Sequence, residues 1–175
     1  SATVERFHEG TTLRTRETVT KYLPTGEPQS ITRQLAGTTQ KVTRWMRYDS
    51  QGRLVLNVEP NTSENFTDDP ESLPPTLRAW RYAYNAAGAL VGTSDARGCG
   101  VNFSYDGAGR LNSEDYSPCR LTHADYSVPN LASRTGIEVL YHYDAAPPEP
   151  LPSGINLTGA FLTGRLVATY DRASL

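Results

Sequence analysis

Two cysteines and two histidines are the side chains of this chain best suited to bind a metal ion or to form a covalent cross-link. Cys99 and Cys119 are the only cysteines, and His123 and His142 follow them. Their spacing matches none of the usual structural zinc sites, in which the ligands come as close pairs. We therefore expect no metal site, and we interpret His142, which lies between two tyrosines of a strand pattern, as an exposed strand histidine.

The two cysteines leave two structural alternatives open, a disulfide or a pair of inert buried thiols. If residues 106–109 form the centre of a hairpin, position 99 pairs near position 116, and Cys119 lies beyond that partner. A bulge at Ser117-Pro118 would then bring the sulfur atoms of Cys99 and Cys119 together, since a disulfide needs Cα atoms within about 7 Å. The candidate disulfide therefore depends on the register of this hairpin.

Serine, histidine and aspartate are common in the chain, but none lies in a frame that activates a nucleophile, such as a Gly-x-Ser-x-Gly turn before a helix. The conspicuous carboxylates instead recur at one repeat position: Asp49, Asp106, Asp144 and Asp171. Recurrence is typical of turn capping, whereas a catalytic pair occurs once in a chain. We therefore expect a protein that is not an enzyme and that needs no cofactor.

These aspartates belong to an internal repeat that begins with Tyr-x-x-x-Gly. It runs through Tyr48–Leu54, Tyr84–Leu90 and Tyr105–Leu111, with a weaker copy at Tyr22, and Tyr143 opens a copy whose turn is expanded. The signature residues are Tyr48, Asp49, Gly52, Arg53, Leu54, Tyr84, Gly88, Leu90, Tyr105, Asp106, Gly109, Arg110, Leu111, Tyr143, Asp144, Gly164, Arg165 and Leu166. We expect the recurring arginines to pair with carboxylates of adjacent repeats as a charge ladder.

Each copy of the repeat predicts a β-hairpin. Aromatic residues alternate with small or polar ones, as in Val101, Phe103 and Tyr105, which places them on one face of a strand. Asp or Asn followed by two residues and Gly forms the turn, because the Asx side chain binds nearby amides and Gly accepts a positive φ. Asp95–Gly98 supplies a reverse turn between hairpins. A single hairpin is marginal in water, so the hairpins must support one another.

The chain is therefore predicted to be all-β, a strip of stacked antiparallel hairpins over residues 1–175, with no helix. Strands are expected near 11–22, 29–36, 40–48, 53–59, 78–84, 89–95, 99–105, 110–116, 137–143 and 164–170. Diverged repeats occupy 1–47, and the clearest repeats are 48–59 and 79–120. The polar or Pro-rich insertions at 60–78 and 145–163 are interpreted as surface loops.

Charge and hydropathy argue against two classes of partner. The formal net charge is −2, and the 17 basic and 19 acidic residues are spread along the chain, which gives no sustained attraction for nucleic acid or anionic lipid. No apolar run approaches the roughly 20 residues that span a bilayer, and the first residues lack the pattern of a signal peptide. We expect a fragment of a longer protein, without nucleic acid as a partner.

The motif Tyr-Asp-x-x-Gly-Arg-Leu, joined through a turn such as Asp95–Gly98 to the next aromatic-x-Tyr-Asp, resembles the Rhs or YD repeat. The resemblance covers about residues 20–175 with interruptions. It implies a strip of hairpins that spirals into a hollow shell, as in bacterial Rhs polymorphic toxins and the B and C components of Tc toxins, and more distantly in teneurins. In the toxins the shell holds a C-terminal toxic polypeptide, and the autoproteolytic core that releases it has no counterpart in this sequence.

From this resemblance we expect a non-catalytic scaffold, part of a shell that is secreted or lies at the bacterial cell surface. Its partners would be other parts of the same large protein or complex and the encapsulated toxin polypeptide. The alternative is a secreted or cell-surface repeat module that binds carbohydrate or a receptor through tyrosine faces. Tyrosines packed between hairpins would favour the scaffold, and tyrosines along an open groove would favour binding.

Overall fold

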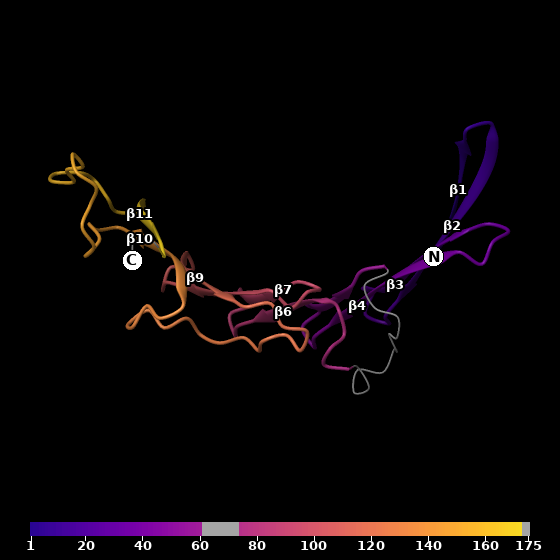
Figure 1. Cartoon of the computed structure of the whole chain (residues 1–175), viewed down its shortest axis with the longest axis horizontal. Coiled ribbons are helices and arrows are strands. Elements are labelled where there is room, and N and C mark those ends of the chain that lie inside the picture. The colour runs from indigo at the N-terminus through magenta and orange to yellow at the C-terminus, as the bar shows by residue number, and fades with distance from the viewer. Residues whose placement is uncertain (61–73, 173–175) are drawn as a thin grey trace.

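A computed structural model describes residues 1–60 and 74–172 of the chain. Its strands are β1 (Ala2–Glu9), β2 (Thr12–Tyr22), β3 (Pro28–Leu35), β4 (Lys41–Tyr48), β5 (Leu54–Val58), β6 (Trp80–Tyr84), β7 (Leu90–Ser94), β8 (Gly100–Tyr105), β9 (Leu111–Ser117), β10 (Ile137–Tyr143) and β11 (Leu166–Asp171). Each strand pairs with the next in one 11-stranded antiparallel sheet (Figure 1). The described residues contain no helix, and the predicted all-β strip of hairpins is confirmed.

Sequence patterns located β2 to β11 with ends within two residues, but β1 was not predicted. Its side chains are nearly all exposed, so they do not alternate between a buried and a solvent-exposed face. β1 instead follows from its ladder with β2, which is supported by ion pairs between Arg16 and Glu5 at 2.5 Å and between Arg14 and Glu9 at 3.1 Å. Tertiary pairing therefore creates this strand without a local signature.

The hairpin turns share one hydrogen-bond pattern. In the turn at Asp49, its amide donates to the Arg53 carbonyl at 2.9 Å and the Gly52 amide donates to the Asp49 carbonyl at 3.0 Å. The Asp49 carboxylate accepts hydrogen bonds from the Gln51 and Arg53 amides. Gly52 has a φ of 75°, which a residue with a Cβ adopts at a cost. The same two backbone bonds recur in the turns that start at Leu23, Asn85, Asp95 and Asp106.

A shift in register precedes every repeat tyrosine. The shifts lie between Lys21 and Tyr22, Arg47 and Tyr48, Ala83 and Tyr84, Ser104 and Tyr105, and His142 and Tyr143. The turn pairs Tyr105 with Leu111, one residue beyond the expected partner, and the shift between Ser104 and Tyr105 adds one more. Gly100 therefore pairs with Ser117, and the predicted pairing of position 99 near 116 is wrong by two residues. The register shift lies beside the hairpin turn, between Ser104 and Tyr105, whereas the bulge was predicted at the other end of the hairpin, at Ser117-Pro118.

The apolar core is divided into two small clusters. One consists of Leu56, Val58, Leu77 and Ala79 with Trp45 packed against it, and the other of Ile137, Leu140 and Tyr170 with Ala168. Leu77 is only 2% exposed, so the end of the insertion at 60–78 is part of the core and not a surface loop. Residues 61–73 of that insertion lie outside the described residues.

Residues 119–128, called the strap below, leave β9 and run back along the sheet beside β6–β8 (Figure 1). The strap contacts the face that contains the paired residues Ala83, Gly92 and Asn102. A Cβ added at Gly92 would lie 3.2 Å from the Tyr126 ring, and Asn102 Nδ2 donates to Ser127 Oγ at 3.4 Å. Small side chains on this face leave room for the strap, whose path the sequence patterns did not predict.

Candidate functional site

The repeat tyrosines connect each hairpin to the preceding one. Their hydroxyls donate to main-chain carbonyls: Tyr48 to Pro28 at 3.1 Å, Tyr84 to Leu54 at 3.0 Å, Tyr105 to Leu90 at 2.6 Å and Tyr143 to Leu111 at 3.0 Å. Every acceptor is the sixth residue after the tyrosine of the preceding repeat, so the bond is periodic. The four tyrosines are half-buried. They are packed between hairpins rather than along an open groove, and we call this series the tyrosine ladder.

Two repeat arginines reinforce the ladder. The guanidinium carbon of Arg53 lies 4.7 Å from the centre of the Tyr84 ring, and that of Arg110 lies 4.3 Å from the Tyr143 ring. Each Nε also donates to the aspartate of its own turn at 2.7 Å. The copy that begins at Tyr84 has Ala89 at this position, so it lacks both an arginine over the next tyrosine ring, that of Tyr105, and an arginine bond within its own turn.

The far ends of these arginines reach the next turn. Arg110 donates to both carboxylate oxygens of Asp144 at 3.1 and 2.5 Å, whereas Arg53 donates to the main-chain carbonyl of Asn85 at 3.3 Å. The predicted pairing with a carboxylate of an adjacent repeat is therefore present for Arg110. Arg165 lies 5.8 Å from the ring of Phe161, within the expanded turn of its own hairpin.

Hydrogen bonds keep the turn carboxylates charged. The Arg110 side chain, followed by the Gly164 amide, lowers the pKa of Asp144 to about 2. For Asp49 and Asp106 the amide of the arginine four residues later is the largest cause of a lowered pKa. These carboxylates accept hydrogen bonds within and between turns, and those bonds favour the charged form.

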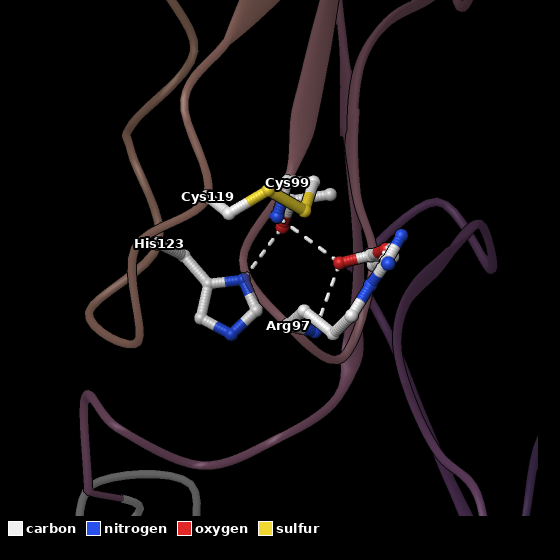
Figure 2. Close-up of a disulfide and its surroundings, with 6 residues drawn as sticks. Arg97, Cys99, Cys119 and His123 are labelled. Atoms are coloured by element: carbon white, nitrogen blue, oxygen red, sulfur yellow. Dashed lines mark hydrogen bonds and ion pairs between the residues drawn. A yellow bond between two sulfur atoms is a disulfide. The ribbon is translucent and has the colours of Figure 1, made fainter.

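Cys99 and Cys119 form a disulfide beside the turn between β7 and β8 (Figure 2). The Asp95 carboxylate holds this turn, because it accepts hydrogen bonds from the amides of Arg97 at 2.8 Å and Cys99 at 3.0 Å. Next to the disulfide, the Arg120 amide donates to the Gly98 carbonyl at 3.3 Å. The start of the strap is thereby joined to the turn by one covalent bond and one hydrogen bond.

His123 fixes the middle of the strap. It is 9% exposed, and its Nδ1 lies 2.7 Å from the Ser94 hydroxyl of β7. Burial, and then the charge of Arg81, lowers the pKa of His123, so the imidazole is neutral at pH 7. Among residues 1–60 and 74–172 no three His, Cys, Asp or Glu side chains are grouped as ligands for a metal ion. Sequence patterns gave no sign of this contact, which joins residues 29 positions apart.

The expectation of an exposed strand histidine at position 142 is wrong. The His142 side chain is 22% exposed, and its Nε2 lies 3.0 Å from a carboxylate oxygen of Glu149. The centres of the His142 and Tyr170 rings lie 5.7 Å apart, and the two rings are nearly perpendicular. The insertion at 145–163 causes this, because it brings Glu149 onto that face, where the carboxylate also pairs with Arg134.

Some aromatic side chains outside the repeat signature are exposed. Trp80 is 40% and Tyr116 49% exposed. The Tyr116 and Tyr141 hydroxyls both donate to the Glu114 carboxylate, at 2.9 and 2.7 Å. The bond to Glu114 raises the pKa of Tyr141 to about 12.

Comparison of the chain with models of known protein families gives no match, and comparison with curated proteins gives none either. Within the described residues there is also no helix with the length and apolar character needed to cross a membrane. The ladder and the strap are therefore the observations from which a function is inferred.

Proposed function

We propose that the chain is a non-catalytic structural segment of an Rhs/YD-repeat shell, which encapsulates a toxin polypeptide within a larger bacterial toxin complex. The observation that carries the proposal is the tyrosine ladder. The side chains that define the repeat bind the neighbouring hairpin, so the repeat is used to build a wall and not to present a surface to a ligand.

Each repeat of the ladder adds its own stabilising contacts with the neighbouring hairpin, which suits a wall built from many repeats. A hydrogen bond of the kind made by Tyr84 contributes about 0.5–1.5 kcal/mol, and a cation–π contact contributes about 0.5–1 kcal/mol at exposed sites and more where it is partly buried, as for Arg53. The apolar clusters are small, so contacts between neighbouring hairpins stabilise much of the sheet. β1 and β11 are the end strands of the sheet, and each offers an edge that a further repeat would pair with.

The location and partners follow from the same proposal. A disulfide between Cys99 and Cys119 persists in oxidising surroundings, which supports a secreted or bacterial cell-surface protein. The partners of the segment are other parts of the same large protein and the polypeptide that it encloses. The turn carboxylates are engaged in hydrogen bonds, which supports a structural role for these residues.

A second candidate function is a repeat module that binds carbohydrate. It is favoured by the exposed rings of Trp80 and Tyr116 and by the carboxylate of Glu114, because sugar rings stack on aromatic faces and bind carboxylates through their hydroxyls. These residues lie outside the ladder, so variants can separate the two functions.

Protease protection in the longer protein that contains this chain tests the proposal. We expect its toxin polypeptide to resist proteinase K, and we expect the double variant Arg53→Ala and Arg110→Ala to make it digestible because the ladder is weakened. The matched control, Trp80→Ala with Tyr116→Ala, is expected to retain protection. Two results together would refute the scaffold proposal in favour of the second candidate. The wild-type protein would leave its toxin polypeptide open to proteinase K, and the isolated chain would bind sugars on a glycan array but lose this binding when Trp80 and Tyr116 are replaced by alanine.

A further inference from the structure

The strap is held on the sheet by few contacts. Of its residues only His123 is buried, and most of the others are exposed. Beyond the disulfide, its contacts include the Arg120 amide on Gly98, the His123 ring on Ser94, the Tyr126 ring over Gly92 and the weak bond from Asn102 to Ser127. His123 also bonds to the main chain of Leu77, and the charge of Asp125 interacts with that of Arg81. The strap has neither helix nor strand structure, so it lacks the ladder bonds that hold the hairpins together.

The disulfide joins two elements that differ in stability. Cys99 is half-buried at the end of a capped turn between two paired strands, whereas Cys119 is exposed at the first residue of the strap. The β8–β9 ladder ends at the pair Gly100 and Ser117, so it does not need the disulfide in order to form. Loss of the disulfide therefore affects the strap before it affects the sheet.

We propose that the Cys99–Cys119 disulfide is a redox latch, and that its reduction lets the strap leave the face of β6–β8. The latch is a property of the chain itself and does not depend on a role in a shell. The uncovered face carries Arg81, Ser94 and Asn102 between small residues, so opening exposes polar groups that the strap covers in the oxidised protein.

The different exposure of the two cysteines sets the course of reduction by a dithiol. One thiolate of the dithiol attacks the sulfur of Cys119, the more exposed of the two residues, the S–S bond breaks, and the Cys99 thiolate leaves and takes up a proton. The second thiol of the dithiol then displaces Cys119, which also leaves as a thiolate and is protonated. Two electrons pass to the protein, and the dithiol becomes a cyclic disulfide.

Hydrogen exchange of the isolated chain, followed by mass spectrometry with and without dithiothreitol, tests the latch. The Arg120 and His123 amides of the strap donate to main-chain carbonyls, and we expect their exchange to rise by roughly tenfold or more on reduction. Exchange in the Asp106–Arg110 turn is expected to stay unchanged, because its bonds do not involve the strap. Titration of thiols establishes that the disulfide has been reduced.

Two variants complete the test. The double variant Cys99→Ser and Cys119→Ser is expected to show the rapid exchange of the reduced chain with or without dithiothreitol. His123→Ala removes the other anchor and is expected to accelerate strap exchange while the disulfide stays intact. Unchanged strap exchange in the reduced wild-type chain would overturn the latch, and so would an equal rise throughout the sheet, which would make the disulfide a support of the whole fold.

Discussion

Gly98 and Gly109 occupy the same position in two equivalent turns, but only Gly98 lies against the strap. Their φ angles are +81° and +78°. A Cβ at Gly98 would lie 1.7 Å from the carbonyl oxygen of Arg120, whereas a Cβ at Gly109 would meet no atom within 4 Å. Substitution of each glycine by alanine therefore introduces the same backbone strain but a different contact.

The expected loss of stability is larger for Gly98→Ala. A residue with a Cβ in the left-handed region costs about 1–2 kcal/mol, which applies to both variants. At Gly98 the obstacle is main chain, so the strap itself must move, and the bond from the Arg120 amide, worth about 1 kcal/mol, is lost with its packing. We expect Gly109→Ala to lower the free energy of unfolding by about 1 kcal/mol and Gly98→Ala by about 3 kcal/mol.

Urea unfolding of the oxidised chain, followed by tryptophan fluorescence, measures this difference. The comparison is repeated in the Cys99→Ser and Cys119→Ser background, where the strap is no longer latched. There the cost of Gly98→Ala is expected to approach that of Gly109→Ala, because a released strap does not obstruct the new Cβ. Equal costs of the two alanines in the oxidised chain would show that the strap does not lie against this turn, and the reasoning would be refuted.

Three further predictions concern the ladder. Tyr84→Phe removes the bond to the Leu54 carbonyl and is expected to lower the free energy of unfolding by about 1 kcal/mol in urea titrations. The control substitution Tyr116→Phe, at an exposed tyrosine, is expected to change it by less than about 0.5 kcal/mol. Equal effects of the two substitutions would contradict the ladder. Ala89→Arg introduces the arginine that stands at the equivalent positions 53, 110 and 165. We expect it to raise the free energy of unfolding in the same titration by about 0.5–1 kcal/mol, whereas no rise would place the new side chain away from the Tyr105 ring. The pKa of Asp144 is about 2 in the folded chain and near 3.8 when unperturbed, so its stabilising effect is complete above pH 4 and is lost as the pH falls through 2. Asp144→Asn is therefore expected to flatten the dependence of the urea midpoint on pH between about 4 and 2, and an unaltered pH profile would contradict this assignment.

Local chemistry explains why the hairpins could be located from the sequence. The turn at Asp106 needs a side-chain acceptor at its first residue and a glycine with positive φ at its fourth, and both requirements are visible as residue types. The alternation of Val101, Phe103 and Tyr105 likewise indicates a strand without knowledge of its partner. Even the expanded turn after Tyr143 retains Gly164, whose amide donates to Asp144 at 2.7 Å.

Contacts between distant residues could not be located in the same way. His123 and Leu77 carry no motif, yet both are buried, because the strap and the segment before β6 pack on the sheet. His142 lies in a strand whose alternation was correctly predicted, but its burial depends on an insertion that has no repeat to guide it. Burial here depends on which segment covers a face, and a strand pattern does not contain that information.

The sequence by itself determined the repeat, the turn chemistry and therefore the strip of antiparallel hairpins. The tertiary structure decided what the repeat residues bind, since Tyr84 reaches Leu54 only after two hairpins have paired in register. It also decided between a disulfide and two free thiols. The register shift beside Tyr105 sets where β9 ends, and the course of the chain after Ser117 sets where Cys119 lies relative to Cys99. Such shifts depend on how neighbouring strands twist and pack, which is a property of the sheet and not of any one strand.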